Sequence, residues 1–292
     1  MNKIIPRRTI EELVAKYTLA QNIKDIFLEG VRDKALIEWF LTRINRHDIV
    51  VYDIQTVEIS NGCIDKYSLN HGSNRSRVIT LSHELVGQLE KVQNIICIAD
   101  KDYLNYIPHP CCSNGILKFT DYCTMELYAF SPEVIEKLVK VVFLGVPFTT
   151  HQLIEAAIQI LKEIFIIRLA NETLGMKLTW VDFHKDLKIS LSNIITFDKT
   201  NFIKRYLLSN GKYDQLEIFN KEILKLASVL NSNPREFIMG HDLIDFFCCI
   251  VKQTKNKKKY LYDHETLSSF LFTSLELGNI ENEELFKTIA KL

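Results

Sequence analysis

The first half of the chain alternates between two patterns of apolar and polar positions. Four short apolar runs, several of them rich in β-branched residues, have the pattern of buried strands. They cover residues 25–28, 49–53, 95–99 and 116–119. Between them, over 35–44 and 81–92, apolar residues recur every three or four positions, as on the buried face of a helix. Strands separated by helices predict βαβ units and a mostly parallel sheet.

The second half of the chain predicts mainly helices. Pro132 follows Ser131 at the first position of a helix, and apolar residues then repeat with helical period over 149–169. Further helices are expected at 199–208, 214–230, 241–253 and 265–276, and a short strand at 178–183. The helical period therefore dominates this part of the chain.

The two halves together predict two domains. We expect an α/β domain over residues 20–145, with a mostly parallel sheet flanked by helices. Its segment 60–77 is rich in Gly, Asn, Ser and His and is expected to be a loop. A mainly α-helical domain is expected over 146–292, where it would supply contacts to substrate, a dimer partner or another protein.

Composition places the chain among folded proteins of the cytoplasm. Of its 292 residues, 47% are hydrophobic and 25% charged, and the net charge is zero. Zero net charge disfavours a globally basic nucleic-acid binder but leaves room for a local basic patch. The chain has neither a stretch long enough for a membrane helix nor a secretory signal, so we expect no membrane partner. The number of cysteines is odd, seven, and their spacing suggests no disulfide framework, which predicts reduced thiols in a bacterial cytoplasm.

Acidic residues follow two of the expected strands. Glu29 comes directly after the first, and Asp100 and Asp102 come after the third and most apolar one. In a parallel α/β sheet the carboxyl ends of the strands are where ligands bind. Three close carboxylates repel one another unless protons or a cation intervene, and their oxygen atoms suit Mg²⁺ or Mn²⁺. The main use of such a metal is to handle phosphates.

The sequence around these acids resembles the Toprim motifs. The first motif, a strand followed by Glu-Gly and a helix start, is matched by FLEGVRDK at residues 27–34. The second, a strand followed by Asp-x-Asp, is matched by ICIADKD at residues 96–102. The resemblance implies a Toprim-like fold in which Asp100 and Asp102 hold the metal. Glu29 would be the general acid or base, or would complete the metal shell.

Two further segments resemble those of stand-alone Toprim-like nucleases, a family that includes the effector subunit of the PARIS anti-phage system. They are residues 119–128, which contain Glu126, and residues 237–244. The resemblance implies a metal-dependent nuclease toxin that a partner ABC-type ATPase restrains and then releases. Once released, it would act as a homodimer and cut RNA, with tRNA the expected target, to arrest translation. Glu126 would be a further metal ligand or acid.

Several basic residues are candidates for contacts with nucleic acid. They are Arg32 and Lys34 beside Glu29, Lys101 between the aspartates, and Lys257, Lys258 and Lys259 in a lysine run after an apolar helix. Arg75 and Arg77 in the polar segment are similar candidates. Such residues neutralise backbone phosphates, but they equally form surface ion pairs or a solvated loop.

Other interpretations remain open at this point. Acidic residues after strands often cap the next helix, and Asp33 suits the N-terminus of a helix in this way. Asp242 has the pattern of a helix cap, and His241 beside it could instead join an active site. The chain could nick DNA rather than cut RNA, or serve as a non-catalytic scaffold that binds nucleic acid or protein.

Overall fold

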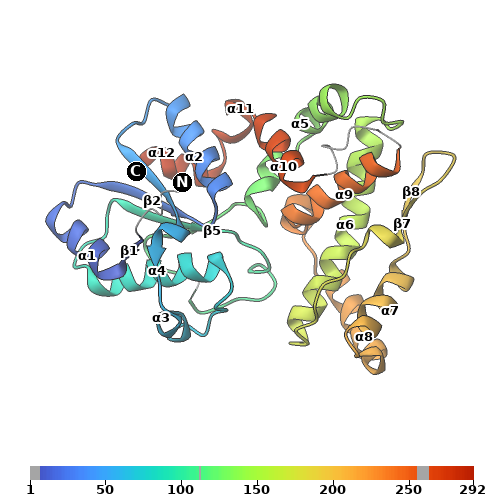
Figure 1. Cartoon of the computed structure of the whole chain (residues 1–292), viewed down its shortest axis with the longest axis horizontal. Coiled ribbons are helices and arrows are strands. Elements are labelled where there is room, and N and C mark those ends of the chain that lie inside the picture. The colour runs from blue at the N-terminus through green and yellow to red at the C-terminus, as the bar shows by residue number, and fades with distance from the viewer. Residues whose placement is uncertain (1–6, 112, 255–262) are drawn as a thin grey trace, which may run out of the picture. The chain divides into compact units, whose positions relative to one another are not determined.

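The computed structural model describes residues 7–111, 113–254 and 263–292, and it divides into two compact units (Figure 1). The first unit comprises Met1–Met125 together with Glu276–Leu292, and the second comprises Glu126–Leu275. The division differs from the domains expected at 20–145 and 146–292, because the chain leaves the first unit earlier and returns to it at the C-terminus. Within the described ranges, no helix combines the length and apolar composition that a membrane crossing needs.

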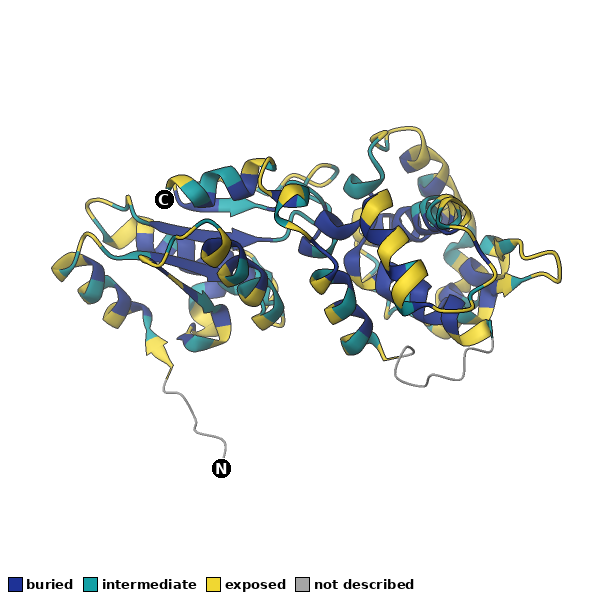
Figure 2. Cartoon of the chain, turned by 90° about the horizontal axis from the view of Figure 1, so that it is seen from above, coloured by how far each residue is buried: buried dark blue, intermediate teal, exposed yellow. Residues whose placement is uncertain are grey.

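The first unit is built on a four-stranded parallel sheet. Its strands are β2 (Lys24–Leu28), β3 (Ile49–Asp53), β5 (Ile95–Ala99) and β6 (Leu117–Phe119). They lie in the order β3-β2-β5-β6, with β2 and β5 at the centre. This confirms the α/β class with a parallel sheet. The central strands are buried on both faces, which explains why they read as continuous apolar runs (Figure 2).

Helices cover both faces of this sheet (Figure 1). On one face lie α1 (Ile10–Leu19) and α4 (Asn74–Gln88), whose apolar side chains share a core with Phe27 and Cys97. On the other lie α2 (Val31–Arg43) and α12 (Glu284–Lys291). Two short strands form a separate parallel pair, β1 (Arg8–Thr9) with β4 (Val57–Glu58). Strand β1 directly precedes α1, and β4 follows β3 and the 3-10 turn η1 (Ile54–Thr56).

The expected loop at 60–77 contains helices. The short helix α3 (Asn61–Asp65) begins after Ser60, and α4 begins after Ser73. Both serines are N-caps whose hydroxyl oxygens accept backbone N–H groups of the first turn. The polar residues that suggested a loop therefore include two helix starts, because serine favours both settings.

The C-terminal helix α12 packs against α2 in the first unit rather than joining the helical unit. Phe286 is buried, and its ring meets Phe40 of α2 edge-on with 4.9 Å between centroids. Glu283 accepts a hydrogen bond from the Tyr122 hydroxyl at 2.8 Å, and the Arg46 guanidinium donates to the carbonyl of Ala290. The short helix α11 (Leu277–Ile280) precedes α12 in the same unit.

We expect Phe286→Ala to destabilise the first unit by about 3 kcal/mol, because it removes a fully buried ring and leaves a cavity against Phe40. Urea unfolding followed by circular dichroism measures this loss. The exposed residue Lys91 serves as the control site, where Lys91→Ala should change the unfolding free energy by less than 0.5 kcal/mol. Equal stability of Phe286→Ala and wild type would show that α12 is not anchored by this ring.

The second unit is mainly helical. Its helices are α5 (Pro132–Lys137), α6 (Thr150–Thr173), α7 (Lys199–Ser209), α8 (Leu216–Ala227), α9 (Gly240–Gln253) and α10 (His264–Thr273), with the π-helix η3 (Leu138–Val142) after α5. Short 3-10 turns, η2 (Met125–Ala129), η4 (His184–Asp186), η5 (Tyr213–Gln215) and η6 (Pro234–Glu236), connect them. The long helix α6 is the centre of the packing, since most of its apolar side chains are buried.

The strand expected at 178–183 does not form. The strands of this unit that the structure describes are β7 (Leu187–Ile189) and β8 (Ile195–Phe197), which form an antiparallel hairpin. At the start of segment 178–183, asparagine side chains form the hydrogen bonds with the backbone that a neighbouring strand would otherwise form. Asn171 accepts the N–H of Leu178 at 2.9 Å, and Asn210 bonds both backbone groups of Thr179. The apolar pattern there reflects single side chains packed into the unit rather than a paired strand.

Asp242 is not a helix cap, contrary to the expectation from sequence. The cap position of α9 is Met239, and Asp242 lies in the first turn. Its buried carboxylate accepts two hydrogen bonds from Arg168 of α6, both at 2.8 Å. The Arg168 guanidinium also lies 3.6 Å from the ring centroid of Trp180. Asp242 therefore ties α9 to α6, a role that local sequence does not indicate.

A carboxylate cluster at the carboxyl edge of the sheet

The two central strands bring the predicted acids to one edge of the sheet. Strands β2 and β5 are parallel neighbours, and Phe27 pairs with Cys97. Counting forward from this pair, Glu29 and Asp100 leave the sheet at the same end. Their placement follows from the parallel topology, as expected for the ligand-binding edge of an α/β sheet.

Glu29 bridges the two strand ends. Its Oε1 accepts the backbone N–H of Asp100 at 2.7 Å, across 71 residues of sequence. Its own carbonyl accepts a hydrogen bond from the Asn74 side chain at 2.9 Å. These bonds hold the Glu29 side chain toward Asp100 rather than toward solvent, which orients it for chemistry at this edge.

The carboxylate of Asp100 organises the next segment of the chain. Its Oδ1 accepts the backbone N–H of Met125 at 3.0 Å. The carbonyl of Asp100 accepts a hydrogen bond from Arg75 Nε at 2.8 Å. Asp100 thus has one carboxylate oxygen engaged by the backbone at the start of η2, while its peptide is anchored to α4.

Asp102 has a backbone conformation that few residues adopt. Its φ is +48°, in the left-handed region that aspartate and asparagine tolerate better than most side chains. Its N–H donates to the carbonyl of Cys123 at 2.8 Å, and its Oδ2 lies 3.3 Å from Arg75 Nε. The turn therefore directs a second carboxylate back toward the edge, and Arg75 balances part of its charge.

Arg75 is the main residue of the cluster whose role sequence reasoning missed. Placed in a loop by its polar neighbours, it was a candidate for RNA contact. It is instead in the first turn of α4, where Nε contacts both the Asp100 carbonyl and Asp102. Its guanidinium also lies 5.5 Å from the ring centroid of Phe119. The N-cap pattern at Ser73 was the one local signal that α4 begins here.

Glu29 has a strongly perturbed acidity. Burial, together with the charges of Asp102 and Asp33, raises its pKa to about 8. The Asp100 N–H and the Arg75 charge act in the opposite direction. Near neutral pH a large fraction of Glu29 is therefore protonated, as expected where carboxylates crowd together without a cation.

Gly30 connects Glu29 to helix α2, and its own backbone does not require glycine. Its φ of −141° and ψ of 164° are extended values that any residue adopts. A Cβ placed there would meet the Asp33 carboxylate at 3.4 Å, an ordinary contact. A side chain at position 30 would therefore lie against the Asp33 carboxylate of α2.

For the remaining predicted site residues, the contacts described are with residues other than the three acids. Glu126 is half-buried on η2, and it is the first residue of the second unit, directly after Met125. Lys101 turns inward, and its ammonium donates to the Asp121 carbonyl at 2.6 Å. Arg32 and Lys34 are half-buried in the first turn of α2, and Lys34 lies 3.7 Å from Glu38.

Other candidates lie elsewhere. The predicted contacts Lys257, Lys258 and Lys259 lie outside the described residues. His241 belongs to the second unit, where its Nε2 lies 3.4 Å from Asp242.

The donors of the cluster suit a hard divalent cation in a partly open site. Among the described residues, no group of three or more His, Cys, Asp or Glu side chains is arranged to hold a metal by itself. Mg²⁺ commonly takes only one or two carboxylates and completes its shell with water and substrate phosphates. Asp100 and Asp102 offer such a pair, and burial, with a smaller contribution from the charges of Asp102 and Asp33, raises the pKa of Glu29 beside them. The donor chemistry therefore fits Mg²⁺ or Mn²⁺ together with a phosphate substrate.

Comparison with known proteins adds no relative. No protein-family model matches the chain, and no curated protein matches it significantly. The functional conclusion therefore depends on the motifs and on the geometry of the edge.

Proposed function

We propose that this chain is a Mg²⁺- or Mn²⁺-dependent endonuclease with a Toprim-like catalytic unit, and that its substrate is RNA. The observation that carries the proposal is the bond between Glu29 Oε1 and the Asp100 N–H, at a strand edge where Asp102 adds a further carboxylate. Two motifs that resemble Toprim sequences thus meet at one point. Acidic residues that served only as helix caps or in surface ion pairs would have no reason to gather at one strand edge.

Each acid has a distinct role in this mechanism. Asp100 and Asp102 would hold the metal through their carboxylate oxygens. When bound, the metal supplies positive charge to the scissile phosphate and acidifies the attacking water. Glu29 exchanges a proton with the reacting oxygens, a role that suits a carboxyl group whose pKa is about 8. Arg75 keeps Asp102 in place and limits repulsion within the cluster.

The biological setting proposed here comes from the resemblance to stand-alone Toprim nucleases. In that setting the chain is a cytoplasmic toxin of an anti-phage system. A partner ABC-type ATPase restrains it, and on release it acts as a homodimer that cuts tRNA. The second, mainly helical unit would then supply contacts to substrate, to the second copy or to the partner. Glu126, at the start of that unit, is proposed as an additional acid.

Expression in bacterial cells tests the proposed function. The chain is produced alone and together with its genomic neighbour, and growth and small-RNA integrity are compared with those of Glu29→Ala. We expect growth arrest and RNA cleavage only when Glu29 is intact. Intact RNA with nicked DNA would identify a DNA nuclease instead. Equal behaviour of Glu29→Ala and wild type in the triggered system would leave a structural cluster on a non-catalytic scaffold.

Metal binding has a consequence that does not depend on knowing the substrate. We expect 5 mM Mg²⁺ to raise the Tm at pH 8 relative to EDTA, because a ligand that binds only the folded state stabilises it. Asp102→Asn should abolish this difference, and Asp214→Asn, at an exposed site in the second unit, should retain it. Differential scanning fluorimetry measures both. A Mg²⁺ effect of equal size in Asp102→Asn would place the metal elsewhere.

A further inference from the structure

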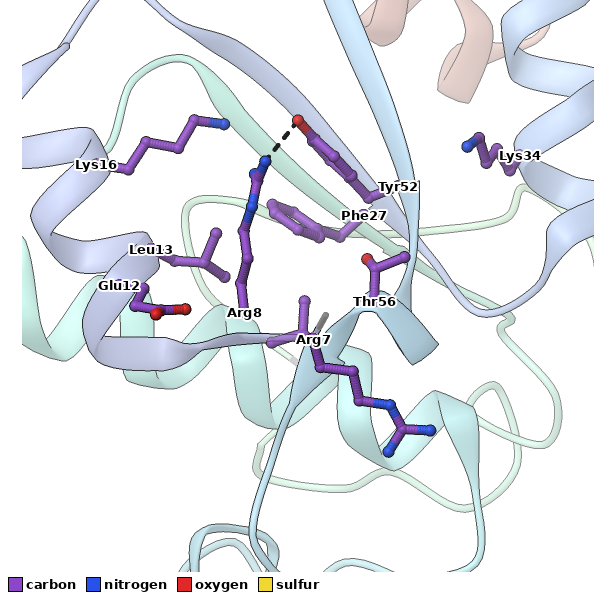
Figure 3. A pocket seen from close by; sticks show the side chains of 10 residues that line it. Arg7, Arg8, Glu12, Leu13, Lys16, Phe27, Lys34, Tyr52 and Thr56 are labelled. Atoms are coloured by element: carbon purple, nitrogen blue, oxygen red, sulfur yellow. Dashed lines mark hydrogen bonds between the residues drawn. The ribbon is translucent and has the colours of Figure 1, made fainter. Parts of the chain in front are cut away.

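A pocket of about 760 Å³ opens in the first unit (Figure 3). Its size is within the range of about 300–1,000 Å³ that is typical of small-molecule sites. Phe27 and Tyr52, paired in register on β2 and β3, form one wall and stack with 5.3 Å between ring centroids. The other walls come from β1, α1, η1 and the first turn of α2.

The charges that line this pocket are mostly positive. Four cationic residues and one acidic residue line it: Arg7, Arg8, Lys16, Lys34 and Glu12. Glu12 forms part of the N-terminal cap of α1, since its carboxylate accepts the N–H of Thr9 at 2.9 Å. Two acids outside the lining offset part of the excess. Lys16 forms an ion pair with the buried Asp25, and Lys34 lies 3.7 Å from Glu38.

Arg8 is the cation best placed to bind a ligand. Figure 3 shows Arg8 and Lys16 reaching toward the hydroxyl of Tyr52, while Arg7 points away from it. The contacts described for the Arg8 guanidinium are with Tyr52, 3.5 Å from the hydroxyl and 5.3 Å from the ring centroid. Within the described ranges, no carboxylate lies at ion-pair distance from Arg8. An exposed guanidinium next to a hydroxyl and an ammonium is a donor set suited to phosphate.

Strand β2 links the pocket to the cluster. Phe27 lines the pocket, and Glu29 follows two residues later, which corresponds to roughly 7 Å of extended chain. Lys34 lines the pocket from the helix that begins directly after Gly30. The donors themselves gather near Asp25, which forms the ion pair with Lys16 and lies four residues before Glu29, or roughly 13 Å of extended chain.

We propose that this pocket is a phosphate-binding subsite in which Arg8, Lys16 and the Tyr52 hydroxyl contact another phosphate of the strand that is cleaved. The inference rests on the proposed nuclease function for the identity of the ligand, a nucleic-acid strand. The same donors would also accept the phosphate of a free mononucleotide. The subsite adds affinity for the strand whose scissile phosphate meets Asp100, Asp102 and Glu29.

Binding measurements on the full chain test this subsite without cleavage. The parent protein carries Glu29→Gln, and the probes are a fluorescein-labelled 12-residue oligouridylate and AMP, followed by anisotropy and calorimetry. We expect Arg8→Gln to weaken oligouridylate binding about tenfold, as for loss of one charged hydrogen-bond donor. The slope of log K against log salt should fall by about 0.7, corresponding to one phosphate of a single strand. Tyr52→Phe, which keeps the ring, should weaken binding about threefold.

The matched control is Arg43→Gln, an exposed arginine in the last turn of α2. It should bind both probes as the parent does. If AMP binds as tightly as the oligouridylate and depends on Arg8, the pocket takes a free nucleotide. If Arg8→Gln and Arg43→Gln bind both probes equally well, the subsite is overturned.

A cleavage assay with Glu29 intact separates this inference from the proposed function. Arg8→Gln should raise KM and leave kcat unchanged. Arg8-dependent binding by a chain that cuts nothing would overturn the nuclease and retain the subsite. Glu29-dependent cleavage with no effect of Arg8 on KM would retain the nuclease and overturn the subsite.

Discussion

Glu29→Gln is expected to lower Mg²⁺-dependent cleavage at least a hundredfold and at the same time to stabilise the metal-free protein. Glutamine keeps the oxygen that accepts the Asp100 N–H at 2.7 Å but cannot transfer a proton. Because burial raises the folded-state pKa of Glu29 from 4.5 to about 8, the folded state binds more protons than the unfolded state between these values. Wild type therefore loses stability as the pH rises from about 4.5 to about 8, and the variant does not.

Urea unfolding in EDTA at pH 5 and pH 8 measures the second effect. At pH 8 the variant should be more stable than wild type by about 2 kcal/mol, and the difference should shrink at pH 5. The control is Glu38→Gln on the exposed side of α2, which should change neither activity nor the pH dependence. Full activity of Glu29→Gln, or a loss of stability at both pH values, would refute the role assigned to this residue.

Arg168→Met is expected to lower the free energy of unfolding of the second unit by about 3 kcal/mol. The substitution leaves the Asp242 carboxylate, whose side chain is only 2% exposed, without the two hydrogen bonds that compensate its burial. Breaking one partner of a buried ion pair is more damaging than removing both, since an uncompensated charge remains. Chemical unfolding followed by tryptophan fluorescence in a Trp39→Phe background reports on this unit through Trp180.

A double variant distinguishes this mechanism from a general packing defect. Arg168→Met combined with Asp242→Leu should recover much of the lost stability, because an apolar pair replaces the stranded carboxylate. The control Lys221→Met, at an exposed position of α8, should cost less than 0.5 kcal/mol. A loss below 1 kcal/mol in Arg168→Met would mean that the pair contributes little to the unit.

The patterns of apolar residues predicted secondary structure correctly where burial of a segment has a single structural cause. The run at 95–99 is a strand whose apolar side chains fill the two covered faces of a parallel sheet, and the β-branched run at 49–53 forms its edge strand, where Val50 is exposed. The same reasoning failed at 178–183, where apolar residues pack singly and Asn171 and Asn210 bond the backbone. Periodicity records burial, and burial alone does not distinguish a paired strand from an anchored loop.

The candidate site shows a similar division. The approach of Glu29 to Asp100 was predictable, since the ends of parallel strands meet at one edge. The positions of Arg75 and Asn74 were not, because α4 begins inside a segment whose composition indicates a loop. The pocket in the first unit was also unpredictable, since β1, α1, β2 and α2 each contribute residues to it.

By itself, the sequence determined the α/β class, the order of the four sheet strands with α2 and α4 between them, and the acids at the strand ends. Apolar period and strand-end chemistry are properties of neighbouring residues, and they can be read without knowing the fold. Only the tertiary structure decided that α12 returns to pack on α2, that Asp242 pairs with Arg168 and that Arg75 joins the carboxylates. Each of these depends on contacts between residues far apart in the chain. The local sequence does not specify such contacts, because they form only when the core brings the residues together.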